Sequence, residues 1–263
     1  LVVAQFHALF PDAPLHVLFD QMSAATRQSL ALPRTHTSWM QHIPGIAQHY
    51  RRLAPLMPRA VRSLDVRSAE LVLSSHHAVA KGVRLTPQQV HVCYCHSPPR
   101  YAWAQRDQYL ADHGITGPSA TVARALLDRL RAFDQRTSAN VHRYIANSRT
   151  VAARIQQAYG RPSVVIPPPV DTEFFTPGGE KVAGVFVAAS RFVPYKRMAD
   201  IVTAFRALAP RQLVVIGDGP DRAAVERAAA GAPHITLLGE VSRDELRSQL
   251  RRAQAFVFAA EED

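Results

Sequence analysis

The stretch GVFVAASRFVPYK, residues 184–196, decides the fold class of this chain. Its first half is apolar almost throughout, as in a strand of a sheet that is covered on both faces. Its second half is a connection in which Pro194 restricts the backbone before a helical period begins near Lys196. A buried strand, a connection and a helix form one βαβ unit, so we expect an α/β fold with parallel sheets.

The same unit recurs along the chain in two series. Strands are expected at 71–75, 90–95, 141–147 and 163–166, and then at 184–190, 212–217, 234–238 and 255–259. Between them, 121–138 places apolar residues on one helical stripe. Ser148 and Ser242 are suited to cap the helices that follow them, and Glu245 completes a capping box with Ser242.

Proline and glycine separate the two series. Three prolines fill 167–169 and Thr-Pro-Gly-Gly fills 176–179, and the periodicity disappears there. A length of 263 residues suits about two domains. We therefore expect an amino-terminal domain over 1–168, a linker over 169–182 and a carboxy-terminal domain over 183–263. Before residue 70, only 43–63 indicates helix, and prolines interrupt it.

Composition excludes a disordered or fibrous chain, because 47% of the residues are hydrophobic and 20% are charged. The net charge of +10 implies attraction to polyanions, whether nucleic acid, anionic lipid or phosphorylated small molecules. Arginines are spread along helix-like segments rather than gathered into one tract, which favours a solvated helix face. Charge alone does not choose among these partners.

The two cysteines and the lengths of the apolar runs indicate the cellular compartment of the protein. Cys93 and Cys95 alternate with other residues in one expected strand, and we interpret them as structural thiols rather than a metal or redox pair. That usage suits a reducing cytosol. No apolar run approaches the roughly 18 residues that a membrane-spanning helix needs. A cytoplasmic location is expected, with peripheral contact to the inner face of the membrane as a hypothesis.

Ligands of open parallel sheets bind beyond the carboxyl ends of the strands. Four segments occupy such positions, at 96–100, 190–196, 217–220 and 261–263. Arg191 and Lys196 would form a phosphate clamp at a helix amino terminus, with an ordinary solvated loop as the alternative. Gly217 and Gly219 allow close backbone approach to a ligand, a weak signal by itself because Arg222 replaces the third glycine of the dinucleotide fingerprint.

Histidines and carboxylates give little sign of a metal site. His96 follows an apolar strand, and it is read either as a structural histidine or as a functional one. The other histidines lack metal-ligand spacing with acidic or cysteine partners. No Asp-x-Asp occurs, so there is no obvious carboxylate pair to hold a divalent cation under a diphosphate. Arginine and lysine would have to neutralise a bound diphosphate.

These segments together resemble retaining GT-B glycosyltransferases of the group 1, family 4 type. The similar stretches, in the family's order, are 145–148 (IANS), 166–175 (IPPPVDTEFF), 190–197 (SRFVPYKR), 213–220 (LVVIGDGP), 238–241 (LGEV) and 259–263 (AAEED). A further stretch at 94–103, YCHSPPRYAW, resembles a mannosyltransferase-like subgroup acting on lipopolysaccharide or exopolysaccharide precursors.

The resemblance implies two Rossmann-like parallel-sheet domains and a reaction. A hexose, best mannose from GDP-mannose, would be transferred with retention to a glycan or lipid-linked acceptor in polysaccharide biosynthesis. No cofactor is implied beyond this nucleotide-sugar substrate. By position, the donor would be bound by Ser190, Arg191, Lys196, Gly217, Gly219, Gly239, Glu240, Val241 and Glu262.

Within that set the resemblance implies different roles. Arg191 and Lys196 would bind the diphosphate and stabilise its developing charge without a metal. The backbone of 239–241 would face the nucleotide base, and Glu262 would contact the donor sugar. His96 would lie near the sugar from the other domain.

The chain departs from the family pattern in three places. The second glutamate of the family's paired motif would lie beyond Asp263, and the first strand would precede Leu1. Pro168 and Pro169 replace the usual asparagine and glycine. Both domains are therefore expected to be incomplete. Because missing strands leave sheet edges exposed, we expect these 263 residues alone neither to turn over donor nor to fold stably.

Two rival readings stay open. One is another GT-B enzyme, such as a sugar-nucleotide epimerase or a starch-type glucan synthase. The other is a basic nucleic-acid-binding module, which predicts aromatic residues interleaved on a basic face. Tyrosines and tryptophans are instead scattered, so no nucleic-acid partner is expected. The basic residues Arg51, Arg52, Arg59 and Arg62 would meet an anionic acceptor or membrane surface.

Overall fold

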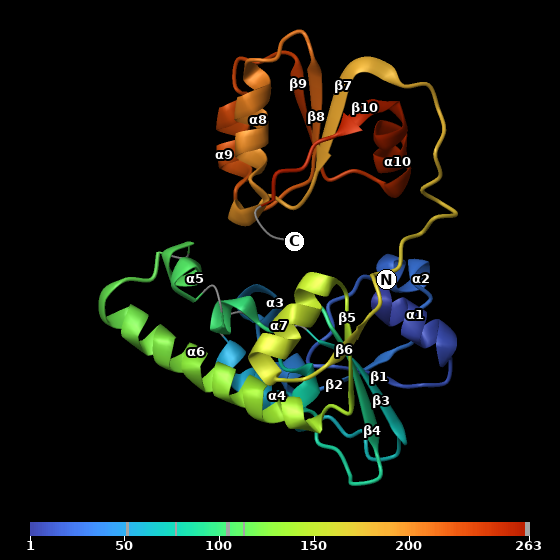
Figure 1. The fold of residues 1–263 in the computed structure, drawn as a ribbon, viewed down its shortest axis with the longest axis vertical. Helices are drawn as coiled ribbons and strands as arrows, with labels where there is room; N and C mark the ends of the chain where they lie inside the picture. Colours follow the sequence, from blue (N-terminus) through green and yellow to red (C-terminus); the bar gives the residue numbers. More distant parts are fainter. Residues whose placement is uncertain (51–52, 77, 104–105, 113, 261–263) are drawn as a thin grey trace. The chain divides into compact units, whose positions relative to one another are not determined.

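A computed structural model describes residues 1–50, 53–76, 78–103, 106–112 and 114–260. The chain forms two compact units, Leu1–Val170 and Asp171–Asp263 (Figure 1). Residues 171–182, which were expected in a linker, belong to the second unit by their contacts. The predicted α/β architecture with parallel sheets is confirmed in both units.

The first unit contains a parallel sheet of four strands in the order β3-β4-β5-β6 and a separate parallel pair β1-β2. Its strands are β1 (Leu15–Val17), β2 (Thr35–Thr37), β3 (Leu71–His76), β4 (Val90–Cys95), β5 (Arg143–Ala146) and β6 (Ser163–Val165). Its α-helices are α1 (Val2–Leu9), α2 (Ala24–Ser29), α3 (Ile46–His49), α4 (Met57–Val61), α5 (Arg106–Asp112), α6 (Gly117–Thr137) and α7 (Arg149–Tyr159). Short 3-10 turns are η1 (Trp39–His42), η2 (Ala54–Leu56), η3 (Ala80–Gly82), η4 (Arg100–Ala102) and η5 (Ser138–Asn140).

The second unit is a four-stranded parallel sheet in the order β10-β7-β8-β9. Its elements are β7 (Val182–Ala189), η6 (Pro194–Lys196), α8 (Met198–Arg206), β8 (Gln212–Ile216), α9 (Arg222–Ala229), β9 (Ile235–Gly239), α10 (Arg243–Arg252) and β10 (Ala253–Phe256). Helices α8 and α9 cover one face of this sheet and α10 covers the other (Figure 1).

Apolar residues on both faces of the second sheet explain why its strands are apolar almost throughout. Ala188 and Leu213 pack with α8 and α9, whereas their strand neighbours Val187 and Val214 pack with α10. Since successive side chains of a strand point to opposite faces, both sets must be apolar. The continuous apolar run in 184–189 is therefore the signature of a sheet between two helical layers.

Both predicted helix caps are confirmed. The hydroxyl of Ser148 accepts a hydrogen bond from the backbone N–H of Val151 at 3.2 Å. The hydroxyl of Ser242 accepts one from the backbone N–H of Glu245 at 3.1 Å. Each satisfies a backbone donor that the first helical turn leaves unpaired, and each fixes the residue at which a helix begins.

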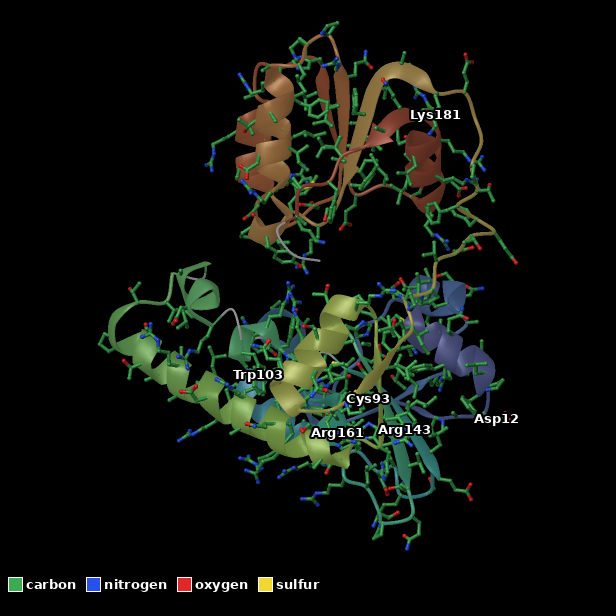
Figure 2. The ribbon with its side chains drawn as sticks, viewed as in Figure 1. Asp12, Cys93, Trp103, Arg143, Arg161 and Lys181 are labelled. Carbon is green, nitrogen blue, oxygen red and sulfur yellow. The ribbon has the colours of Figure 1, made fainter. Side chains whose placement is uncertain are left out.

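Both cysteines are buried in the first unit as free thiols. Figure 2 labels Cys93 there. Burial raises the pKa of the Cys93 thiol to about 12 and also raises the pKa of Cys95. Both side chains stay neutral and pack with Tyr144 and Ile155 in the core, which agrees with structural thiols.

In the described part of the chain, no helix combines the length and apolar character that crossing a bilayer requires.

Candidate functional site

The carboxyl ends of β7, β8 and β9 lie side by side and bring three of the predicted segments together. The backbone N–H of Ser190 donates to the carbonyl of Ile216 at 3.1 Å, and the N–H of Gly217 donates to the carbonyl of Gly239 at 2.8 Å. Ser190, Gly217 and Gly239 therefore form a row across three neighbouring strand ends. This is the edge at which parallel sheets bind ligands.

The connections after β7 and β8 are interlocked through their backbones. The N–H of Phe192 donates to the carbonyl of Asp218 at 2.9 Å, and the N–H of Asp221 donates to the carbonyl of Phe192 at 3.1 Å. A Cβ atom added to Gly219 would lie 2.3 Å from the Phe192 carbonyl oxygen, closer than atoms can approach. Gly217 and Gly219 therefore permit close approach of the protein's own backbone, and the predicted approach of a ligand to these glycines stays a prediction.

Arg191 occupies the centre of the connection after β7. Its side chain is exposed, and among the described residues it forms no hydrogen bond or ion pair. Its neighbour Phe192 is only 3% exposed and anchors the connection in the core. A rigid backbone therefore presents a cation that has no partner in the described part of the chain, as a site for an anion requires.

Lys196 ends the 3-10 turn η6 and lies between aromatic rings. Its ammonium nitrogen is 5.5 Å from the ring centroid of Tyr195 and 5.1 Å from that of Phe258. Phe258 follows β10, so Lys196 lies beside the connection that leads to residues 261–263. The structure therefore places Lys196 beside Phe258, although the two residues are far apart in the sequence.

Arg197 turns the chain from η6 into α8. It adopts a left-handed backbone conformation, with φ of 52°, and its guanidinium pairs with Asp200 in the first turn of α8 at 2.7 Å. The left-handed region is uncommon for a residue with a side chain. Because of this turn, α8 begins only after Arg197. Lys196 therefore belongs to the connection that also carries Arg191, and not to the helix.

The third segment, 239–241, contains both structural and exposed side chains. Gly239 has φ of 69°, which favours glycine at this turn. Val241 packs under α10 against the buried Val187 and Ile216. The side chain of Glu240 is exposed. The valine therefore serves the core, and the backbone and Glu240 are the parts of this turn that face outward.

Two groups of predicted residues lie outside the described residues. Glu262 belongs to 261–263, and Arg51 and Arg52 belong to the segment 51–52. Their predicted roles stay predictions.

His96 belongs to the first unit and is held from two sides. Its Nε2 atom is 2.8 Å from the Ser75 hydroxyl, and its ring centroid lies 5.2 Å from that of Tyr94. Its backbone N–H donates to the carbonyl of His76 at 3.0 Å. The side chain is half-buried at the carboxyl end of β4. These contacts fix the orientation of the His96 ring. A fixed ring is compatible with a substrate contact and with a purely structural role.

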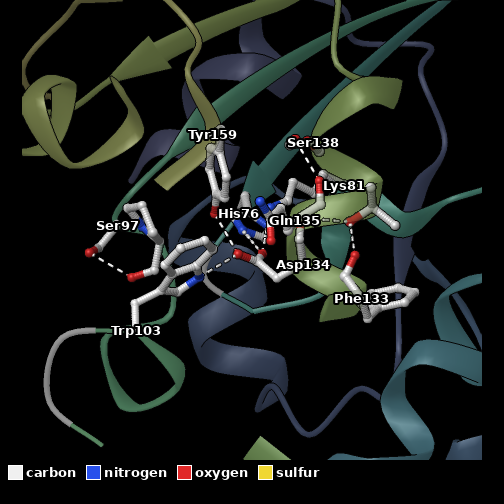
Figure 3. Close-up of polar contacts among 12 residues, drawn as sticks. His76, Lys81, Ser97, Trp103, Phe133, Asp134, Gln135, Ser138 and Tyr159 are labelled. Carbon is white, nitrogen blue, oxygen red and sulfur yellow. Dashed lines mark hydrogen bonds and ion pairs between the residues drawn. The ribbon is translucent and has the colours of Figure 1, made fainter. Parts of the chain in front are cut away.

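A buried polar cluster around Asp134 was missed by sequence reasoning (Figure 3). The Asp134 carboxylate is fully buried and accepts hydrogen bonds from the Lys81 ammonium at 2.5 Å, the Trp103 indole at 2.9 Å and the Tyr159 hydroxyl at 2.8 Å. His76 Nε2 lies 3.5 Å from the same carboxylate. The sequence feature that indicates a buried carboxylate is the position of Asp134, four residues after Leu130 on the apolar stripe of α6.

The charges of this cluster balance each other. Burial by itself raises the pKa of Asp134, but His76 and Lys81 outweigh it, so the pKa of Asp134 is lowered. Burial lowers the pKa of Lys81, and the Asp134 carboxylate opposes this. The Lys81 ammonium also lies 3.8 Å from the ring centroid of Tyr159. The ionised carboxylate is thus held by several donors, as a buried charge requires.

Segment 171–176 is fastened to the exposed face of α10. Asp171 accepts from Arg243 at 2.6 Å, and the guanidinium groups of Arg243 and Arg247 lie 4.4 and 4.2 Å from the Phe174 ring centroid. Arg251 donates to the hydroxyl of Thr176 at 2.6 Å. The "VDTEFF" part of the motif at 166–175 therefore serves as the attachment of this segment to the second unit.

Similar folds occur among solved glycosyltransferases. HepE of Anabaena, solved with UDP and glucose, matches with a TM-score of 0.58 and 14% identity over 98% of this chain and 69% of that one. WaaB, a lipopolysaccharide outer core galactosyltransferase, matches with a TM-score of 0.55 and 14% identity over the same shares. A glycosyltransferase of Rickettsia africae matches with a TM-score of 0.54 and 12% identity over 99% and 68%. No curated protein matches the sequence.

Two parallel-sheet units and these neighbours show the GT-B fold. Family models match both units. Residues 14–174 match Glycosyltransferase Family 4, and residues 183–262 match Glycosyl transferases group 1. The chain belongs to glycosyltransferase family 4.

Proposed function

We propose that this glycosyltransferase moves a hexose from a nucleotide diphosphate donor to a glycan or lipid-linked acceptor, with retention at the anomeric carbon. GDP-mannose is the preferred donor, on the resemblance of the 94–103 stretch to mannosyltransferases. The observation that carries the proposal is Arg191, an exposed cation with no partner among the described residues, on the same connection as Lys196.

The two cations supply the chemistry that transfer requires. Cleavage of the bond between sugar and phosphate leaves negative charge on the diphosphate. Arg191 and Lys196 neutralise this charge from a backbone that is already fixed, so no reorganisation is needed during the reaction. A divalent metal is not required for this step, and the nucleotide sugar is the substrate rather than a cofactor.

The remaining predicted residues complete the donor site. The connection at 217–219 and the turn at 239–241 line the nucleotide, with the exposed Glu240 facing outward. Glu262 is assigned to the donor sugar, and His96 is assigned a catalytic role. Ser75 fixes the orientation of the His96 ring by the hydrogen bond at Nε2.

The acceptor side is basic and faces an anionic glycan or the inner face of the membrane. Arg59 and Arg62 are exposed in the α4 region, and the Arg62 guanidinium lies 5.3 Å from the Phe133 ring centroid. The location is cytoplasmic or peripheral to the membrane. Reversing both charges is expected to reduce binding to anionic vesicles, and unchanged binding would exclude this contact.

A donor panel tests the reaction. The full-length protein is incubated with GDP-mannose, UDP-glucose and UDP-galactose, because the solved neighbours carry UDP and glucose or are described as a galactosyltransferase. Proton NMR then identifies the sugar and its anomeric configuration in the product. Transfer with inversion would exclude retention, and release of an epimerised nucleotide sugar without transfer would favour an epimerase. That the 263 residues alone are inactive stays a prediction.

A further inference from the structure

We propose that Asp134 is a positioning residue for glycosyl transfer and fixes the connection 96–103, which carries His96, through the indole of Trp103. This inference rests on the proposed function of His96. Asp134 touches no substrate in this assignment. It acts by holding one end of a segment whose other end carries His96.

A side-chain hydrogen bond holds each end of the connection 96–103. At its start, His96 Nε2 is 2.8 Å from the Ser75 hydroxyl. At its end, the Trp103 indole donates to Asp134 at 2.9 Å. Between these points Ser97 and Ala102 are 8% and 2% exposed. The segment is therefore packed near both of its ends, so we expect a shift of one end to displace the other.

Trp103 is also held by its faces. The Arg131 guanidinium lies 4.4 Å from the indole ring, one turn before Asp134 on the same helix α6. The Tyr159 ring packs edge-on at 6.0 Å, and its hydroxyl donates to the same Asp134 oxygen as the indole does. One carboxylate oxygen thus sets the position of an aromatic pair from two different elements (Figure 3).

A carboxylate is the only group of this size that can serve all these donors. Ionised aspartate accepts at both oxygens, and Lys81, Trp103 and Tyr159 all donate to it. Asparagine would turn an N–H₂ group toward one set of donors. A fully buried ion pair is weak evidence for stability, since well-packed apolar residues often replace it without loss. The arrangement instead favours a geometric role, in which the ion pair specifies one position for the connection.

The primary test compares Asp134→Asn, Trp103→Phe and a control, Asp128→Asn, in the full-length protein. Asp128 lies on the same helix but pairs with Arg106 at an exposed position. We expect the first two variants to lower kcat about ten- to a hundredfold, with the donor KM changed less than about threefold. The control should keep both constants. Trp103→Phe leaves the Asp134–Lys81 pair intact, so it remains informative if Asp134→Asn does not fold.

A double variant separates position from stability. Asp134→Asn with Lys81→Met removes the unpaired buried charge and should recover much of the thermal stability lost in Asp134→Asn. The kcat should stay low, because the anchor for Trp103 is still altered. Recovery of kcat together with stability would overturn the proposal and leave the cluster with a structural role alone.

An activity-independent measurement distinguishes this proposal from the proposed function. The chain has two tryptophans, so Trp39→Phe leaves Trp103 as a single fluorescent reporter. In that background, Asp134→Asn should raise the acrylamide quenching constant at least about twofold. Unchanged quenching would overturn the positioning role. If the parent protein transfers no hexose from any donor while quenching still changes, the proposed function fails and the anchoring of the connection stands.

Discussion

The carbonyl oxygen of Ser190 lies 1.9 Å from the position that a Cβ atom on Gly217 would take. Such a distance is far inside van der Waals contact, so the backbones after β7 and β8 touch without room for any side chain. The connection that carries Arg191 is consequently braced by its neighbour. This contact makes the position of the proposed diphosphate site a property of the sheet edge rather than of a free loop.

Replacing Gly217 by alanine should destabilise the protein strongly. The Cβ would clash with backbone rather than with a flexible side chain, and φ of 130° is unfavourable for alanine. We expect a loss of about 3 kcal/mol in the free energy of unfolding. Gly231→Ala is the matched control, because φ is 73° there but nothing lies within 4 Å of the added Cβ. Its cost should be about 1 kcal/mol in urea titrations, and equal losses would show that the Ser190 contact is unimportant.

Arg191→Ala should impair catalysis without destabilising the fold. Removing one group that stabilises developing charge typically lowers kcat about a hundred- to a thousandfold. Because the side chain is exposed and forms no hydrogen bond or ion pair among the described residues, the free energy of unfolding should change by less than about 0.5 kcal/mol. Arg211→Ala, at the opposite end of β8, makes the same charge change and should preserve kcat/KM. Comparable losses in both variants would point to net charge as the cause.

Phe258 should contribute to the function of Lys196. The ring lies 5.1 Å from the ammonium and limits where it can point. Phe258→Leu removes this cation–π contact, which at an exposed site is worth about 0.5–1 kcal/mol, so the donor KM should rise about two- to fivefold. A double-mutant cycle with Lys196→Met supplies the check. If the two substitutions were additive in kcat/KM, the contact would have no catalytic effect.

The two buried thiols should be unreactive in the native protein. Burial raises the pKa of Cys93 to about 12, so at pH 8 the nucleophilic thiolate is absent as well as inaccessible. Reaction with a disulfide reagent should proceed only through unfolding and accelerate in urea. An unfolded thiol ionises at about pH 8.5, whereas the folded Cys93 thiol stays protonated up to about pH 12. The contribution of this thiol to the free energy of unfolding is therefore fully present below about pH 8.5 and is lost as the pH rises toward 12. Rapid labelling in native buffer would contradict the buried placement.

The strands of both sheets were predictable because their signal is local. Val90–Cys95 was predicted to the residue, and 184–190 and 212–217 were displaced by at most two residues from β7 and β8. Each of the features used depends on only a few neighbouring residues: the alternation of strand and helix, the prolines at the domain boundary and the serines at the helix caps. The short β1 and β2 were not predicted, since three residues carry too little pattern to be recognised.

The candidate site was only partly readable. The motif positions Arg191 and Lys196 were found from the sequence, but the ring contact that orients Lys196 comes from Phe258, which is 62 positions later in the chain. Gly217 and Gly219 were noted for close approach, yet the sequence could not say that the approaching group is the backbone of Ser190 and Phe192. Such contacts depend on strand order, which local pattern does not contain.

Local sequence pattern is enough to predict an α/β chain with two series of parallel strands and a basic connection after the first strand of the second series. The hydrogen bonds of Asp134 with Lys81, Trp103 and Tyr159, which lie 53, 31 and 25 residues away from it, come from the packing of the first unit. The physical reason is that periodicity arises from neighbouring residues sharing one helix or strand. A buried carboxylate acquires its partners from whichever elements pack around it, and that packing is set by the whole unit.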